Sequence, residues 1–193
     1  MAGLLSVEHM KEQWTQIERL LEARGCLDQI GLRPGAPDEQ IAALGAHLGV
    51  NFPDSVRWSL SIHDGQNGPV GLVGGAQLLS VEQIRREWDV WRSLDEASMN
   101  SDCASFMASH PTGVIKSMYT NRSWIPLTQD WGGNHIGLDF DPDLMGTIGQ
   151  IIRFGRDEDT KLLVAVSFDV FIEKLTAALS KSIWNGKNLE STV

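Results

Sequence analysis

The sequence predicts helices at both ends of the chain and one small antiparallel sheet between them. Apolar residues recur every three or four positions before residue 60 and again after Ser167, which is typical of helices packed on a core. Between Trp124 and Phe168, four apolar runs alternate with three connectors rich in Gly, Asp and Asn, as strands alternate with turns. The length of 193 residues suits one domain, which we expect to span 1–193.

The composition favours a folded, acidic, cytoplasmic protein. Hydrophobic residues make up 42% and charged residues 21% of the chain, and the formal net charge is -9. This charge argues against nucleic acid as a direct partner, because phosphate binding needs a Lys/Arg face. Cys26 and Cys103 lie far apart and match no metal or disulfide pattern, so we expect reduced thiols. We expect neither a signal peptide nor a membrane span, since no apolar stretch approaches ~18 residues.

The N-terminal part of the chain is expected to form three helices. The first begins after a cap at Ser6 and closes at Gly25. A loop over 26–36 follows, after which a second helix starts at Pro37 and a third, short one at Pro53. The residues expected to face the core are Val7, Met10, Trp14, Ile17 and Leu21, then Ile41, Leu44 and Leu48, then Val56 and Leu60.

A glycine-rich stretch over 65–76 comes next. It predicts turns and a short strand near 70–73. It is not a phosphate-binding loop, because neither the GxxxxGK pattern nor GxGxxG occurs in it. Ser80 and Gln83 then form a capping box, which predicts another helix. The core-facing residues of that helix are Val81, Ile84, Trp88, Trp91 and Leu94.

Residues 95–123 are the least patterned part of the sequence. Polar residues with scattered methionines predict an irregular insertion before the sheet. Within it we expect a helical turn at 103–109 and a strand at 114–118.

The strands of the sheet are predicted by residues that alternate in polarity. A period of two indicates one buried face and one partly open face. The turn residues of 141–146 join two strands as a hairpin. Ser167 caps a last helix that covers the buried face, and the tail after Ser182 is expected to fray, with Trp184 as a tether. The alternating residues are Ile125 and Leu127, then Ile136, Leu138 and Phe140, then Ile148, Ile152 and Phe154, then Leu162, Val164 and Val166.

A metal or catalytic site is not favoured by the sequence. Asp139, Asp141 and Asp143 begin a calcium-loop spacing, but Leu144 and Gln150 stand where the loop needs Gly and Glu. The histidines and cysteines match no ligand or nucleophile pattern. We therefore expect no catalytic residue, metal or cofactor.

One histidine is a candidate for a functional imidazole. His135 follows Gly132-Gly133-Asn134, and with Asp130 or Asp139 it would make a metal-binding or hydrolytic site. A plain turn or strand-edge histidine is the favoured alternative.

Acidic residues gather in the predicted sheet. Thr128 to Asp159 holds seven acidic residues against two arginines, a net -5 within the whole-chain -9. Acidic loops around an aromatic side chain would bind a basic protein surface, although turns also favour Asp for reasons of their own. The predicted partner contacts are Asp130, Trp131, Asp139, Asp141, Asp143, Asp157 and Asp159.

Several phrases, taken in order, resemble the SUKH superfamily, which includes fungal cell-wall-assembly regulators and bacterial immunity proteins. The resemblance spans roughly residues 14 to 175. The phrases are Trp14 with Ile17-Glu18, Phe52-Pro53-Asp54, Leu60, Asp64-Gly65, Trp124-Ile125-Pro126-Leu127, Gly132-Gly133-Asn134, Gly137-Leu138-Asp139, Gly149-Gln150-Ile151, and Phe168 with Phe171 and Leu175.

This resemblance implies an α+β fold with N-terminal helices, a mostly antiparallel twisted sheet and a C-terminal covering helix. It also implies no catalytic apparatus. Trp124, Gly133 and Asp139 match the family pattern as structural or groove-lining residues, and we add His135 to that group.

Three functions follow as hypotheses, and the oligomeric state stays open. The leading one is a non-enzymatic immunity protein whose acidic loops occlude the basic active site of a toxin. The alternative is a regulatory or scaffolding adaptor in cell-wall assembly, ranked second because the fungal members carry long disordered arms that this chain lacks. A metal-binding or hydrolytic enzyme using His135 comes last.

Overall fold

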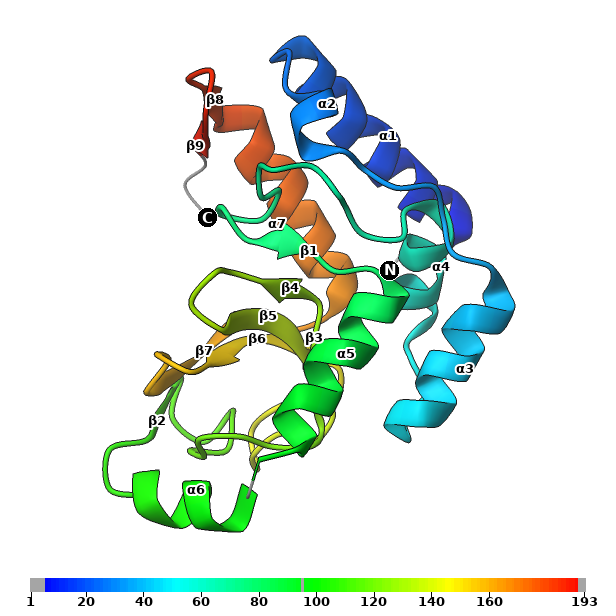
Figure 1. The fold of residues 1–193 in the computed structure, drawn as a ribbon. Coiled ribbons are helices and arrows are strands. Elements are labelled where there is room, and N and C mark those ends of the chain that lie inside the picture. The colour runs from blue at the N-terminus through cyan, green and yellow to red at the C-terminus, as the bar shows by residue number, and fades with distance from the viewer. Residues whose placement is uncertain (1–5, 95, 191–193) are drawn as a thin grey trace.

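The computed structural model describes residues 6–94 and 96–190 and has an α+β fold (Figure 1). The first residues of the chain, on which the signal-peptide prediction partly rests, and the last three of the predicted tail lie outside the described residues. The helices are α1 (Val7–Ala23), α2 (Leu27–Ile30), α3 (Asp38–Leu48), α4 (Asp54–Ile62), α5 (Val81–Arg92), α6 (Glu96–Cys103) and α7 (Phe168–Lys181). The strands are β1 (Gln77–Leu78), β2 (Ala108–His110), β3 (Trp124–Pro126), β4 (Thr128–Gln129), β5 (Asn134–Asp139), β6 (Gln150–Gly155), β7 (Thr160–Ala165), β8 (Ile183–Trp184) and β9 (Leu189–Glu190).

Capping side chains set the start of three helices where the sequence predicts them. The Ser6 hydroxyl accepts a hydrogen bond from the backbone of His9 at the start of α1. Ser80 and Gln83 form the complete capping box of α5, and Ser167 caps α7. Each cap satisfies backbone N–H groups that have no partner within the helix, so local sequence fixes these starts.

The central sheet has five strands in the order β2-β7-β6-β5-β3. Its pairings are antiparallel except that β2 runs parallel to β7. The mostly antiparallel sheet is therefore confirmed. Two short ribbons, β1–β4 and β8–β9, stand beside it.

Each face of this sheet carries a buried cluster, and only part of the sheet stays open, since Leu162, Leu163 and Val164 on β7 are half-buried. On one face α7 packs between the strands and the helices α1 and α4, as Figure 1 shows. The buried strand residues on that side include Ile125, Leu138 and Ile151. On the other face a second, smaller core forms. Its buried members are Ile115, Trp124, Ile152 and Phe154.

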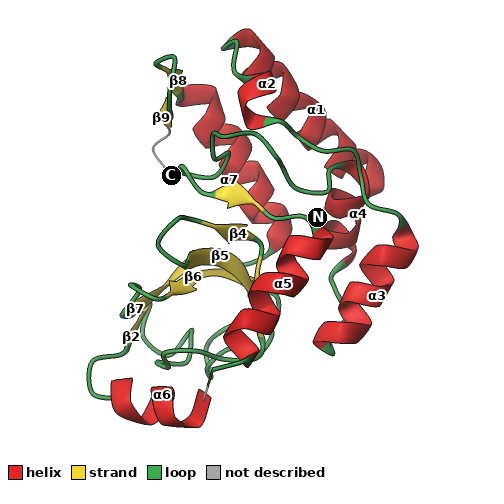
Figure 2. Cartoon of the chain, in the orientation of Figure 1, coloured by secondary structure: helices red, strands yellow, loops and turns green. Residues whose placement is uncertain are grey.

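The second core depends on the segment that the sequence left unassigned. The stretch between α6 and β3 is mostly loop (Figure 2), yet it places Ile115 with no exposed surface against the strands. The expected strand at 114–118 is absent there, and the expected helical turn at 103–109 is replaced by the end of α6 and by β2. The irregular insertion thus acts as a cover for the sheet.

The predicted strand near 70–73 is also wrong, and the buried side chain of Gln66 gives the reason. Its amide oxygen accepts hydrogen bonds from the backbone of Leu72 at 3.0 Å and Leu78 at 2.9 Å, and its nitrogen donates to the carbonyls of Ile30 and Val70. These bonds satisfy backbone groups that a strand would pair with another strand. The stretch consequently stays a loop.

Four of the predicted apolar strand residues lie outside the strands, namely Leu127, Phe140, Ile148 and Val166, and the tail differs from expectation. Ile148 and Val166 are exposed beyond the ends of β6 and β7. Where fraying was expected after Ser182, β8 and β9 form a hairpin, and Trp184 packs against the main core.

We expect Ile115→Ala to lower the free energy of unfolding by about 2–5 kcal/mol, because it opens a cavity in the second core. Urea denaturation measures this change. Thr112→Ala, on the exposed part of the same segment, is the matched control and should stay within about 0.5 kcal/mol of the parent. Equal stabilities of the two variants would show that the segment does not seal the sheet.

Candidate functional site

The structure divides the predicted acidic contacts between opposite ends of the sheet. β5 pairs antiparallel with β6 from Asn134↔Gly155 to Asp139↔Gln150, a length of roughly 20 Å at about 3.3 Å per residue. One end carries Asp130, Trp131, Asp157 and Asp159. The other end carries Asp139, Asp141 and Asp143. They do not form one continuous acidic rim.

Asp139 cannot contact a partner, because it has no exposed surface, and its prediction as a contact is wrong. Its carboxylate accepts hydrogen bonds from the Gln150 side chain and from the backbone of Asp141, both at 2.9 Å. Burial raises the pKa of Asp139, and these hydrogen bonds oppose the rise. Asp139 is therefore a buried support for the loop that follows it.

Two more of the predicted carboxylates are occupied within the chain. Asp130 accepts hydrogen bonds from the backbone of Gly132 and Asn134, both at 2.8 Å, which shape the turn before β5. Burial alone would raise the pKa of Asp130, but these bonds outweigh it and the pKa is lowered. The Asp141 carboxylate accepts hydrogen bonds from the Lys116 ammonium at 2.5 Å and from the Asn121 side-chain amide. Both bonds lower the pKa of Asp141, and the bond from Lys116 has the larger effect.

The remaining predicted contacts stand nearer to solvent. Trp131 is 87% exposed, Asp157 and Asp159 are exposed in the connection between β6 and β7, and Asp143 is half-buried. Trp131 is the kind of rigid aromatic side chain that anchors protein interfaces. These residues remain candidates for partner contact.

His135 is fully engaged inside the molecule, which removes the basis for an imidazole-centred site. Its Nδ1 donates to the carbonyl of Thr128 at 2.7 Å, and its Nε2 accepts the indole N–H of Trp91 at 3.0 Å. Because a carbonyl only accepts and an indole only donates, this is the neutral Nδ1–H tautomer. Burial lowers the pKa of His135. Among residues 6–94 and 96–190, no three His, Cys, Asp or Glu side chains are grouped as metal ligands.

The two other predicted structural residues lie near this histidine in the fold. Trp124 packs against Phe154 in the second core, with ring centroids 5.5 Å apart. Gly133 has a φ of 87°, which suits glycine in the tight turn before β5.

The loop joining β5 to β6, residues 140–149, exposes three large apolar side chains. Leu144 is 99%, Ile148 71% and Met145 68% exposed. Exposed apolar side chains that cluster on one segment are typical of interaction sites. Sequence reasoning missed this surface by assigning Ile148 to a strand, although Leu144 and Met145 directly after an Asp-Pro-Asp turn were a signal for it.

The stretch between α6 and β3, residues 104–123, which we call the covering segment, fixes the backbone of the β5–β6 loop. Met145 donates to the carbonyl of Gly113 at 2.9 Å, and the Gln150 side chain donates to the carbonyl of Val114 at 3.0 Å. At Gly146 a Cβ atom would lie 2.2 Å from that same Val114 oxygen, so only glycine fits. A fixed loop presents its apolar side chains with little ordering cost on binding.

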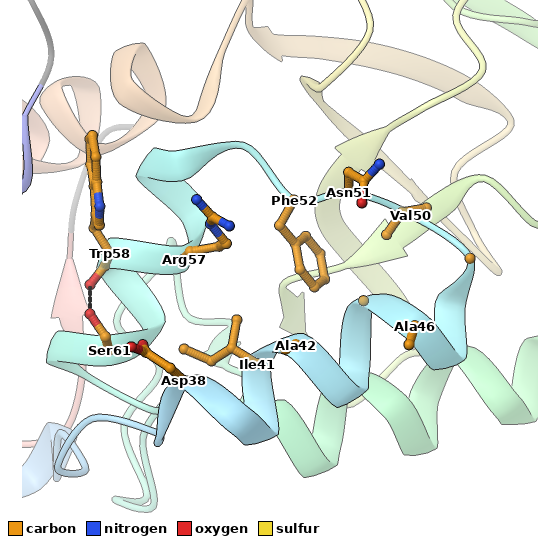
Figure 3. A pocket seen from close by; sticks show the side chains of 12 residues that line it. Asp38, Ile41, Ala42, Ala46, Val50, Asn51, Phe52, Arg57, Trp58 and Ser61 are labelled. Carbon is orange, nitrogen blue, oxygen red and sulfur yellow. Dashed lines mark hydrogen bonds between the residues drawn. The ribbon is translucent and has the colours of Figure 1, made fainter.

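A cleft lies between α3 and α4 (Figure 3). Its volume is about 670 Å³, and Ile41 and Phe52 face each other across it with Arg57 nearby. A Cβ on Gly149 of the loop would be 3.6 Å from the ring of Pro53, which follows Phe52. Apolar walls with a few polar groups are typical of binding clefts.

Comparison with known proteins assigns the chain to a family. A family model described as SMI1 / KNR4 family (SUKH-1) matches residues 35–174. The chain belongs to the SMI1/KNR4 family. The match includes the α3–α4 cleft and the β5–β6 loop, whereas α1 lies outside it.

Similar SMI1/KNR4 proteins come from fungi. The chain is 36% identical, over 92% of its length, to the "Cell wall biosynthesis/cell cycle regulator smi1" of Schizosaccharomyces pombe. It is 32% identical over 89% to the "Glucan synthesis regulatory protein" of Neurospora crassa, and 31% identical over 71% to the "Cell wall assembly regulator SMI1" of Saccharomyces cerevisiae. It spans 37%, 38% and 34% of these relatives, so it corresponds to just over a third of their length.

The buried His135 should make stability depend on pH. Because its pKa is lowered in the folded chain, the unfolded chain takes up a proton first as the pH falls below about 6.5. The free energy of unfolding should therefore decrease with falling pH in that range, by at most about 1.4 kcal/mol per pH unit from this group. Urea denaturation at about pH 5 and pH 7 measures it.

We expect His135→Gln to lose this part of the pH dependence. Trp91→Phe, which removes the indole donor to Nε2, should weaken it and serves as a second variant. His110→Gln removes an exposed histidine and should behave like the parent. An unchanged pH dependence in both His135→Gln and Trp91→Phe would contradict the assignment.

Proposed function

We propose that this chain is a non-enzymatic, protein-binding domain with a regulatory or scaffolding role in cell-wall assembly. The observation that carries this proposal is the similarity, over 92% of the chain, to a fission-yeast protein named as a cell-wall biosynthesis regulator. Other relatives are named for glucan synthesis and cell-wall assembly, and these names describe regulators.

The surface of the chain supports binding to other proteins. The fixed β5–β6 loop exposes Leu144, Met145 and Ile148, and Gly149 at its base lies near Pro53, which follows Phe52 of the α3–α4 cleft. The proposed contacts to a basic region of a partner remain Trp131, Asp157 and Asp159, together with Asp143 on the β5–β6 loop. The imidazole of His135 is already occupied by Thr128 and Trp91, which favours a role without catalysis.

The relatives favour the regulatory role over neutralisation of a toxin. The fungal names include no toxin and no immunity protein. Because this chain matches just over a third of each relative, the lack of long arms carries no weight against the regulatory role. We propose a cytoplasmic location from the free thiols Cys26 and Cys103. None of the described helices is long and apolar enough to cross a membrane.

A chimera tests the proposed function. The matching segment of the fission-yeast regulator is replaced by this chain in cells that lack their own copy. We expect the chimera to restore growth on an inhibitor of glucan synthesis and to restore wall glucan content. A chimera with Leu175→Asp, which places a charge in the buried face of α7, is the unfolded control and should not rescue. A chimera that accumulates normally yet grows like the deletion would refute the proposal.

A second variant of the chimera tests the loop. We expect Leu144→Ser with Ile148→Ser to abolish rescue while changing the free energy of unfolding by less than about 1 kcal/mol, since both side chains are exposed. Val90→Ser with Phe106→Ser replaces two exposed apolar residues away from the proposed contacts and should rescue fully. Normal rescue by the loop variant would place the partner contact on another surface.

A further inference from the structure

A groove with a basic border runs between α7 and the strands β5, β6 and β7. We call it the basic groove and define it by Ile136, Arg153, Leu162, Val164, Lys174 and Lys181. Its volume is about 420 Å³. It lies apart from the β5–β6 loop and the α3–α4 cleft, with which it shares no lining residue.

The ionisable side chains that line the basic groove all carry positive charge. They are Arg153, Lys174 and Lys181, in a chain whose net charge is -9. Such a local excess does not follow from the composition of the protein. Between these cations lies an apolar floor of Ile136, Leu162 and Val164.

Arg153 forms a long ion pair with Glu158, whereas Lys174 and Lys181 form no ion pair among the described residues. The Glu158 carboxylate lies 4.0 Å from the Arg153 Nε, and the Arg153 side chain is 42% exposed, so its guanidinium stays accessible to a further carboxylate. Lys174 donates to the carbonyl of Val164 at 2.6 Å, which leaves two of its ammonium protons available. Lys181 is exposed in the last turn of α7.

The sheet is open at its edge beside this groove. β2 pairs with Thr160, Lys161 and Leu162, so residues 163–165 of β7 have no strand outside them among the described residues. Open strand edges bind extended peptides through backbone hydrogen bonds, while side chains of the peptide fill neighbouring pockets. Leu163 and Val164 belong both to this edge and to the groove.

We propose that the basic groove binds an extended segment of a partner protein in which acidic and apolar residues alternate. The apolar side chains would lie on the floor formed by Ile136, Leu162 and Val164. The carboxylates would remain at the border, within reach of the long side chains of Arg153, Lys174 and Lys181. This site is independent of the proposed function, because that function is carried by family membership and by other surfaces.

The test uses the purified chain and a synthetic peptide of about nine alternating glutamate and valine residues, the length of a long strand. We expect saturable binding by fluorescence anisotropy that weakens as the salt concentration rises. Amide NMR shifts should change most in β7 and α7. A peptide with lysine in place of glutamate, and one with serine in place of valine, should each bind at least tenfold more weakly.

Charge variants of the protein locate the site. Lys181→Glu combined with Arg153→Gln should weaken binding of the Glu/Val peptide about tenfold. Arg19→Glu, an exposed reversal on α1, is the matched control and should bind like the parent. Lys174 is left unchanged because its bond to Val164 contributes to the fold.

Three results would overturn the proposal. The first is no saturable binding of the Glu/Val peptide at low salt. The second is equal binding by the parent and the Lys181→Glu/Arg153→Gln variant. The third is that the parent chain sediments with phosphatidylserine vesicles and does not bind the peptide, while the Lys181→Glu/Arg153→Gln variant no longer sediments. That result would show that the groove binds anionic lipid. None of these results bears on rescue by the yeast chimera.

Discussion

Polar side chains that are buried on the strands of the five-stranded sheet depend on partners inside the molecule, because water cannot reach them. Asp139 is bonded by Gln150, and His135 lies between Thr128 and Trp91. Lys161 has no exposed surface; it donates to the carbonyl of Glu158 and lies near the rings of Tyr119 and Trp124. Burial lowers the pKa of Lys161 to about 8, so keeping it charged costs roughly 3 kcal/mol at neutral pH.

These internal partners also shape the surface. Gln150 not only bonds the buried carboxylate of Asp139 but also accepts the backbone N–H of Thr147 and donates to Val114. One buried amide therefore joins two strands, the covering segment and the β5–β6 loop. The exposure of Leu144, Met145 and Ile148 follows from this arrangement, since the loop cannot fold its apolar side chains inward without breaking the bonds at its base. The hydrogen bonds of Gln150 and Asp139 within the sheet thus fix the loop that exposes Leu144, Met145 and Ile148.

Local sequence was sufficient for elements whose signals lie within one turn or one strand. The caps Ser6, Ser80 and Ser167 and the spacing of apolar residues predicted α1, α5 and α7, and alternation predicted β5, β6 and β7. Alternation shows which residues share a face but not what packs against it. The cover provided by Ile115 was invisible for that reason, because residues 104–123 have no period.

Sites assembled from distant residues were equally hidden. In the sequence Asp139 resembles a loop carboxylate, because its buried partner Gln150 lies eleven positions later in the chain. The basic groove takes Arg153 from a strand and Lys181 from a helix, so no stretch of sequence shows a basic cluster.

The folded sheet holds the proposed contact surfaces, which differ in charge, at fixed places. In our proposals the turn end, with Trp131, Asp157 and Asp159, would bind a basic partner, whereas the basic groove would bind an acidic one. Like charges brought together at an interface cost several kcal/mol, so a uniformly charged partner can satisfy only one of these two surfaces. The apolar loop at the opposite end, roughly 20 Å along β5, has no such preference. Three proposed surfaces of different chemistry on one sheet fit the proposed adaptor role, because each could bind a different partner without displacing the others.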